Sequence, residues 1–335
     1  MLLLAVSVRD SVPVHHNVEH LILYVRYMID RRLRVLQAIA RHGTVTAAAE
    51  VCRLTPSAVS HQMQALAREL DVALLEPIGR NVRLTPAART LLEHGETLTA
   101  QWELARADLA AHRAGAVGGT LRFAAFSSAA AVVVPRALDQ LRREHPALRV
   151  HLRESEPARS FDLLAADDAD LAVVVATPSI PPASDAAFEQ QVLFDEPLDV
   201  LVGPGHRLLG RDGVALSDLA ADPWICSNPG RAYHQLVTLA CTAAGFAPDI
   251  AHFADEWDTG AALVARGFGV ALVPRLADLP GHHDTRRLPI TTDPVPTRRV
   301  IAAVRAGSQE QPVIAAGLAA LRHVTSTDLP ALASS

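Results

Sequence analysis

The stretch TVTAAAEVCRLTPSAVSHQMQALARELDVALLEPIGRNVRL, residues Thr44–Leu84, decides the fold of the N-terminal part of this chain. Thr44 is a good helix N-cap, and apolar residues recur behind it at helical spacing. A second helix start follows at Thr55, because Pro56 suits the first helical position and an apolar stripe continues to Leu70. The segment therefore predicts two consecutive helices joined by a tight turn.

A third helix precedes these two, and a β-hairpin follows them. Arg31 to His42 is amphipathic, and Gly43 stands where such a helix should end. Short strands are predicted at Ala73–Leu75 and Val82–Leu84, with a loop at Glu76–Asn81 that contains Pro and Gly. Three helices followed by a hairpin, or wing, are typical of a winged helix-turn-helix, whose second motif helix enters the major groove of DNA.

The polar face of this segment carries the residues that we expect to contact DNA. Residues 31–90 contain nine Arg and four acidic residues, a local charge of +5 in a chain of net charge −5, and phosphate binding needs such a basic patch. The predicted DNA-binding residues, in the first turns of the two motif helices and in the wing, are Thr44, Thr55, Pro56, Ser57, Ser60, His61, Gln64, Arg80, Asn81 and Arg83. The alternative is an ordinary three-helix packing element with a solvated polar surface.

From about residue 28 to 115 the chain closely resembles the LysR-type transcriptional regulators. The resemblance rests on RRLRVLQAIARHGTVTAAAE, LTPSAVSHQMQALAREL and LLEPIGRNVRLTPAA, and it continues through TLRFAAFSS, LAVVV and ALVARGFGVALVP. The chain departs from the family at His61, where many members have Arg, and at Leu75-Glu76-Pro77, where Phe-Glu-Arg is commoner. Arg can make a bidentate guanine contact that His cannot, so the base read at His61 stays open.

The resemblance implies a multi-domain fold with an N-terminal all-α winged helix-turn-helix, a long linker helix and a C-terminal α/β two-lobed effector domain like that of periplasmic solute-binding proteins. It also implies partners: double-stranded DNA, a second copy of the chain in a homodimer that commonly becomes a homotetramer, a small-molecule effector and RNA polymerase. The expected boundaries are 1–27 for a non-native or disordered N-terminal extension, 28–85 for the DNA-binding domain, 86–119 for the linker and hinge, 120–325 for the effector domain and 326–335 for a tail. Within the effector domain, lobe 1 takes about 120–178 and 297–325, and lobe 2 about 179–296.

The linker region shows a seam that favours dimerisation. From Pro86 to Arg113 the sequence is helical without internal Pro. Apolar residues at steps of seven, four, three and four form the stripe, namely Leu91, Leu98, Trp102, Ala105 and Leu109. A regulator that reads a two-fold operator needs such a seam, because dimer symmetry sets the distance between its recognition helices. A linker helix packed on its own domain is the alternative.

The C-terminal part alternates strand-like and helix-like segments, which predicts parallel sheets with right-handed crossovers. In such sheets a ligand sits beyond the carboxyl ends of the strands. The residues expected there are Ser127, Ser128, Ser227, Asn228, Asp258 and Thr259. They form the predicted effector pocket, and hydroxyls with backbone donors suit a small carboxylate or another small polar metabolite. Each of them also fits the alternative role of a helix cap.

Several function classes find no support in the sequence. It contains no G-x-S-x-G elbow, P-loop or H-E-x-x-H motif, and no Cys or His pair has zinc spacing, so we expect no catalytic residues, no metal site and no cofactor beyond the effector. Cys226 and Cys241 are expected to be buried thiols, although a redox switch is conceivable. No apolar run is long enough for a membrane span, and we expect a cytoplasmic protein. A solute-binding or sensor protein whose N-terminal helices contact a partner is the alternative to a regulator.

Overall fold

The computed structural model describes residues 30–79, 81–112, 117–291 and 295–333. The chain forms two compact units, residues 1–99 and 100–335. Among the described residues, no helix has both the length and the apolar character that crossing a bilayer requires.

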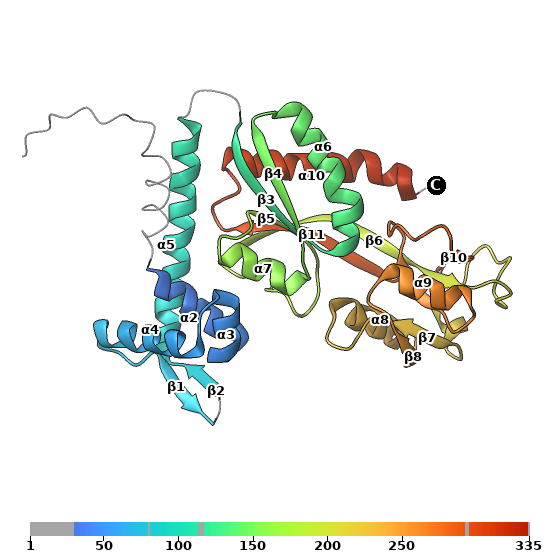
Figure 1. Ribbon diagram of the computed structural model, residues 1–335, viewed down its shortest axis with the longest axis horizontal. Coiled ribbons are helices and arrows are strands. Elements are labelled where there is room, and N and C mark those ends of the chain that lie inside the picture. Colours follow the sequence, from blue (N-terminus) through green and yellow to red (C-terminus); the bar gives the residue numbers. More distant parts are fainter. Residues whose placement is uncertain (1–29, 80, 113–116, 292–294, 334–335) are drawn as a thin grey trace, which may run out of the picture. The chain divides into compact units, whose positions relative to one another are not determined.

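The N-terminal unit is a winged helix-turn-helix (Figure 1). Its elements are α2 (Arg31–His42), α3 (Val45–Cys52), α4 (Pro56–Glu69), β1 (Leu75–Ile78), β2 (Asn81–Leu84) and the first part of α5 (Pro86–Ala111). The predicted helix starts are confirmed. The hydroxyl of Thr44 accepts a hydrogen bond from the backbone N–H of Ala47 at 3.1 Å, and that of Thr55 accepts one from Ala58 at 3.2 Å. Both threonines are therefore N-caps.

One apolar core holds the three helices and the wing together. Leu36 and Ile39 of α2 pack with Val59 and Met63 of α4, and all four side chains are almost fully buried. The start of α5 closes the core, since Leu92 belongs to the same cluster. Because the buried face of α4 is packed in this core, the position of its exposed face is fixed as well.

The first wing strand differs from the predicted Ala73–Leu75. Strand β1 begins only at Leu75, and the pairing of Ile78 with Asn81 leaves a two-residue turn. Gly79 makes that turn possible because its φ of +59° lies in the left-handed region. The backbone before Leu75 does not pair with β2. Instead, the carbonyl of Ala73 accepts a hydrogen bond from the hydroxyl of Thr85 at 2.7 Å. The wing is thus a tighter hairpin than predicted.

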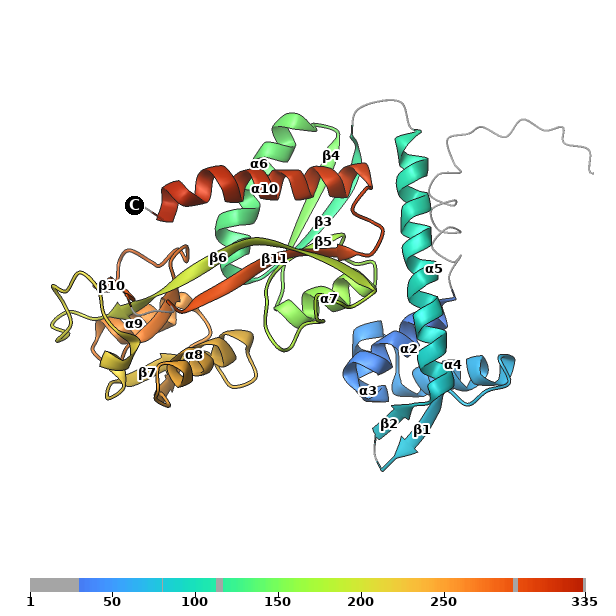
Figure 2. The ribbon, with the colours of Figure 1, turned by 180° about the vertical axis from the view of Figure 1, so that it is seen from behind.

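Lobe 1 of the C-terminal unit is a sheet covered by helices on both faces. Its elements are β3 (Gly119–Ala125), a π-helical turn (Ala129–Val133), α6 (Val134–Glu144), β4 (Leu148–Glu154), α7 (Pro157–Ala165), β5 (Leu171–Val175) and α10 (Pro312–Ala333). Helices α6 and α10 cover one face and α7 covers the other (Figures 1 and 2). Alternation along β3 explains this, because Phe123 packs with α6 and α10 while Ala124 packs with α7.

Lobe 2 repeats this layering on a smaller scale. Its elements are a 3-10 turn (Leu216–Leu219), β7 (Pro223–Cys226), α8 (Ala232–Ala243), β8 (Asp249–Phe253), α9 (Trp257–Ala265), β9 (Ala271–Pro274) and β10 (Arg286–Pro289). Strands β7 and β8 are parallel. Trp224 of β7 is fully buried in one core with residues of α8, and its ring centroid lies 5.9 Å from that of Phe246.

The predicted parallel pairing is present between β3 and its neighbours β4 and β5 and between β7 and β8, whereas the two long strands that connect the lobes are antiparallel. Strands β6 (Phe188–Val202) and β11 (Thr297–Arg305) run antiparallel to each other and cross from one lobe to the other. The large sheet is therefore mixed, with strand order β10-β6-β11-β5-β3-β4 and β9 paired to β6. Charged and amide residues in the first half of β6 hide its strand character in the sequence, and β10 is a short edge strand that begins with two Arg.

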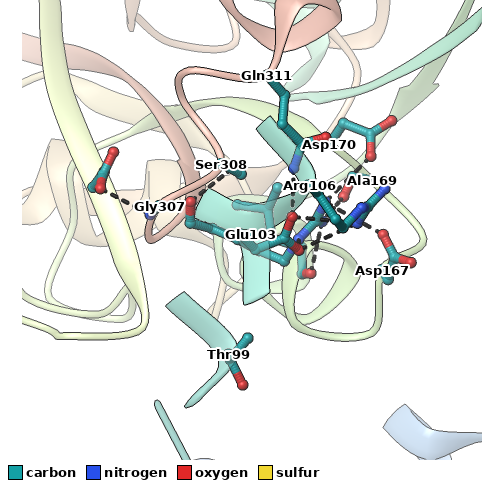
Figure 3. Close-up of polar contacts among 12 residues, drawn as sticks. Thr99, Glu103, Arg106, Asp167, Ala169, Asp170, Gly307, Ser308 and Gln311 are labelled. Atoms are coloured by element: carbon teal, nitrogen blue, oxygen red, sulfur yellow. Dashed lines mark hydrogen bonds and ion pairs between the residues drawn. The ribbon is translucent and has the colours of Figure 1, made fainter. Parts of the chain in front are cut away.

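A buried ion network fixes the last turns of α5 to lobe 1 (Figure 3). Nε of Arg305 donates to Oε1 of Glu103 at 2.8 Å, and both side chains are about 5% exposed. Arg305 also donates to the carbonyls of Leu164 and Ala169, and Gln311 donates to Oε2 of Glu103. Burial lowers the pKa of Arg305, but the nearby charges, those of Asp167 and Glu103 foremost, outweigh it and raise the pKa. The guanidinium therefore stays charged inside the protein.

Replacing Glu103 should destabilise the C-terminal unit strongly. Glu103→Ala leaves Arg305 buried without one of its carboxylates and deprives Gln311 of its acceptor, which costs about 3–5 kcal/mol of unfolding free energy. Denaturant unfolding of the full chain measures this change. Asp108→Ala, on the exposed side of the same helix, is the matched control and should change the free energy by less than about 0.5 kcal/mol. Equal stability of the two variants would contradict the structural role of Glu103.

Candidate DNA interface and effector cavity

The polar face of α4 presents the predicted base-reading residues together. Ser57, His61 and Gln64 are exposed and Ser60 is half-buried, all within the first nine residues of the helix. The hydroxyls of Ser57 and Thr55 lie 3.0 Å apart in a hydrogen bond. Pro56 is exposed at the helix start. Short side chains on an exposed helix start have the dimensions that entry into a major groove requires.

The wing places Asn81 and Arg83 on its exposed surface, whereas Arg80 lies outside the described residues. Nη2 of Arg83 is 2.7 Å from Oε2 of Glu76 across the hairpin. Both side chains are about half exposed, so this ion pair is weak and can be exchanged for phosphate. DNA contacts of all ten predicted residues, those of α4 included, stay predictions.

The C-terminal unit contains a cavity of ≈ 170 Å³ between its two lobes. Residues of lobe 1 line one side, among them Phe126 and Val175, and residues of lobe 2 line the other, among them Tyr233 and Trp257. The rings of Tyr233 and Trp257 meet edge to face at 5.1 Å. A cavity of about 150 Å³ holds a molecule as large as benzene. This cavity therefore has room for a small metabolite.

A buried arginine forms part of the cavity wall where the crossing strands meet lobe 1. Nε of Arg298 donates to Oε2 of Glu196 at 2.7 Å, and its Nη2 donates to the hydroxyl of Ser128 at 2.7 Å. The guanidinium lies 4.9 Å from the centre of the Phe126 ring. Glu196 also accepts from the backbone N–H of Leu276 at 2.8 Å. The charge of Arg298 is thus already balanced within the protein.

A second arginine bridges the two lobes. Nη1 of Arg231, at the start of α8, is 2.6 Å from Oε1 of Glu156 in lobe 1, and its Nη2 is 3.2 Å from Oδ2 of Asp255 in lobe 2. Hydrogen bonds from the backbone and side chain of Asn228, with that of Arg231, lower the pKa of Asp255. Because the bridge is partly exposed, each contact is individually weak, but it is made only while the lobes are close.

The structure brings three of the six predicted effector residues to the cavity. Ser127, Ser128 and Ser227 line it. The Oγ of Ser227 is buried and has no conventional hydrogen-bond partner among the described residues. Asn228 instead orients Asp255. Asp258 and Thr259 are absent from the lining. No contact with an effector is observed for any of the six, and their role stays a prediction.

The cavity also contains four acidic residues that were not predicted from the sequence. Glu154 ends β4 and Glu156 follows it, Asp255 and Glu256 follow β8, and all four line the cavity. The rule that singled out the serines, polar residues after the carboxyl end of a parallel strand, also applies to β4 and β8 and could have found them. With Arg298 balanced by Glu196, the lining carries more negative than positive charge.

The two cysteines of lobe 2 are buried in its core. Cys226 is 3% exposed and Cys241 is fully buried. Burial raises the pKa of the Cys226 thiol to about 11 and that of the Cys241 thiol to about 12. The reactive thiolate is consequently scarce at neutral pH.

Comparison with known proteins agrees with this architecture. Residues 31–89 match the family described as bacterial regulatory helix-turn-helix protein, lysR family, and residues 114–326 match the LysR substrate binding domain. The chain is 28% identical over 247 residues to the hydrogen peroxide-inducible genes activator of Dickeya chrysanthemi, covering 74% of this chain and 79% of that one. It is 29% identical over 248 residues to the transcriptional dual regulator GltC of Bacillus subtilis (73% and 80%).

Solved structures show the same fold. A cysteine mutant of Corynebacterium glutamicum OxyR aligns with a TM-score of 0.59 at 24% identity, covering 90% of this chain and 93% of the other. Full-length BenM aligns with a TM-score of 0.57 at 25% identity, covering 89% and 97%.

A winged helix-turn-helix and a two-lobed ligand-binding unit in one chain define a DNA-binding protein that responds to a small molecule. This chain belongs to the LysR family of transcription regulators. It is a DNA-binding regulator with a helix-turn-helix domain and an effector-binding domain, and the family match supports this function over that of a solute-binding protein.

The buried thiols should resist modification in the folded protein. Because Cys226 and Cys241 are protonated and shielded at pH 7.5, both should react with a thiol-specific disulfide reagent at least about a hundred-fold more slowly than in the denatured chain. Absorbance kinetics on Cys52→Ser protein isolates these two thiols. Rapid labelling of the folded protein at neutral pH would contradict the burial described above.

Proposed function

We propose that this regulator binds a two-fold operator as a homodimer formed through α5 and is controlled by a small polar effector in the interlobe cavity. The observation that carries the proposal is the cavity itself, lined from both lobes and bridged by Arg231. A ligand that prefers the closed arrangement of the lobes shifts the population toward it. Assembly into tetramers, contact with RNA polymerase and a cytoplasmic location complete the proposal and follow from the family resemblance.

The surface of α5 supports dimerisation. Leu98 and Leu109 of the predicted seam are 58% and 63% exposed, although both are large apolar side chains. Trp102 and Ala105 between them are half-buried. An exposed apolar stripe on a long helix favours pairing with the same stripe of a second copy.

Two substitutions should separate base reading from phosphate binding. Ser60→Ala should weaken binding to the operator by about 1 kcal/mol and leave binding to unrelated DNA nearly unchanged, because one hydrogen bond near the bases is lost. Arg83→Ala should weaken binding to both DNAs and lower the salt dependence by about one phosphate contact. Fluorescence titrations at several salt concentrations, with DNA from upstream of the regulator's own gene, measure both effects.

Arg149→Ala removes the same charge from an exposed strand position in the effector unit and is the matched control. It should bind both DNAs as the wild type does. Equal, weak binding of all four proteins to both DNAs would mean that the helix-turn-helix does not read this sequence.

The charges of the cavity favour an effector with an amino or ammonium group. Four carboxylates line it, those of Glu154, Glu156, Asp255 and Glu256, against Arg231 and the internally balanced Arg298. A ligand carboxylate would meet net repulsion there, whereas a cation would gain Coulomb attraction and contact with the Trp257 ring. These charges outweigh the preference for a carboxylate that hydroxyl groups alone suggest.

A matched set of small molecules tests the charge preference. Butylamine, butyramide and butyrate share size and shape but differ in charge, and we expect only the amine to raise the thermal midpoint at millimolar concentration. Asp255→Asn should reduce the shift, whereas Asp249→Asn, an exposed residue outside the cavity, should preserve it. Stabilisation by butyrate alone would contradict the preference for a cationic effector and indicate an anionic one.

Oxidation is the second route of control to consider, because two relatives are named hydrogen peroxide-inducible genes activators. The buried, protonated thiols of Cys226 and Cys241 do not support it in this chain. Ligand binding in the cavity is therefore the control that we propose.

A further inference from the structure

Two histidines and an aspartate converge at the edge of lobe 2. Nε2 of His283 lies 2.9 Å from Oδ1 of Asp258, and Nε2 of His282 lies 3.4 Å from the same oxygen. The two imidazole rings are 4.0 Å apart. One ligand atom from each of the three residues lies within 4.8 Å of the others. Asp258 and a histidine pair 24 and 25 positions further along the chain thus place three potential metal ligands close together.

These separations match the edges of a metal coordination shell. Zinc binds imidazole nitrogen and carboxylate oxygen at about 2.0–2.1 Å with tetrahedral geometry, so neighbouring ligand atoms stand about 3.3 Å apart. The two distances to Asp258, 2.9 and 3.4 Å, bracket that value. The two imidazole nitrogens lie within 4.8 Å of each other, and binding of all three residues to one ion brings them to about 3.3 Å.

The donor set selects the class of metal. Two imidazoles and one carboxylate suit Zn²⁺ and its transition-metal neighbours, whereas Mg²⁺ and Ca²⁺ prefer oxygen ligands. The side chains of Asp258 and His282 are 60% and 69% exposed, so an ion can reach them from solvent, while His283 is 13% exposed and held in place. Three protein ligands leave the fourth position open to water.

The cluster joins two segments that also form the cavity wall. Asp258 lies next to Trp257 at the start of α9, and His282 and His283 lie just beyond Leu279; both Trp257 and Leu279 line the cavity. We propose that Asp258, His282 and His283 form a binding site for a divalent transition-metal ion of the zinc class at the rim of the effector cavity. A bound ion would tie the start of α9 to the segment after β9.

Isothermal titration of the untagged full-length protein with Zn²⁺ tests the site. The wild type should bind one equivalent that His282→Gln/His283→Gln and Asp258→Asn proteins bind at least about ten-fold more weakly. His15→Gln/His16→Gln is the matched control, because it removes the chain's other His-His pair, which lies outside the described residues. This control should keep wild-type affinity, and Mg²⁺ should not compete.

Cobalt gives a second readout. Co²⁺ added to the wild type should produce the visible absorption of a low-symmetry, four-coordinate site, and the double-histidine variant should lack it. The thermal midpoint of the Asp258→Asn protein without metal should equal that of the wild type, because Asp258 is exposed. Failure of the wild type to bind Zn²⁺, equal affinity in the double-histidine variant, or loss of binding only in the His15/His16 variant would each overturn the proposal. None of these readouts depends on DNA or effector binding.

Discussion

The charge of Arg305 is the constraint around which lobe 1 is assembled. A buried guanidinium must be surrounded by acceptors. These come from Glu103 of α5, from the carbonyls of Leu164 in α7 and Ala169 after it, and from Asp170 before β5. Such a cluster adds little net stability compared with apolar packing, but it is intolerant of any missing member. Helix, sheet and connecting segment are therefore held in one arrangement, and the last turns of the linker helix belong to the effector unit.

The cavity contains two arginine–carboxylate pairs that differ in their exposure to water and therefore in strength. Arg298 is enclosed and paired with Glu196, so it shapes the wall of the cavity and has no charge left for a ligand. Arg231 is partly exposed and holds carboxylates of both lobes, so its contacts break and form at low cost. A ligand can shift the equilibrium between open and closed lobes only if both arrangements are populated. Weak contacts between the lobes allow this, whereas strong ones would keep the protein closed without ligand.

Local sequence signals predicted local structure well and long-range pairing poorly. Thr44 and Thr55 predict the starts of their helices because a capping hydroxyl and its N–H partner are only three residues apart in the sequence. The direction of β6 and β11 depends on pairing with a strand about a hundred residues away, and local helical or strand periodicity carries no information about that partner. The serines of the cavity were predicted because polar residues after a parallel strand lie at its ligand-binding edge, but the carboxylates of the cavity were not predicted. The hydrogen bond between Asp258 and His283 depends on the packing of segments 25 residues apart. The family resemblance supplied the two-lobed architecture.

Both passages of the chain between the lobes belong to one two-stranded ribbon, in which Glu196 faces Arg298 and Asp195 faces Arg299. Since neighbouring strand residues point to opposite sides, the first ion pair is buried and the second is about half exposed. Dissolved salt screens the outer pair but hardly reaches the inner one. Ionic strength therefore acts on the outer side of the interlobe ribbon as well as on the proposed phosphate contacts of the helix-turn-helix, and a DNA-binding domain alone would lack the effect at the ribbon.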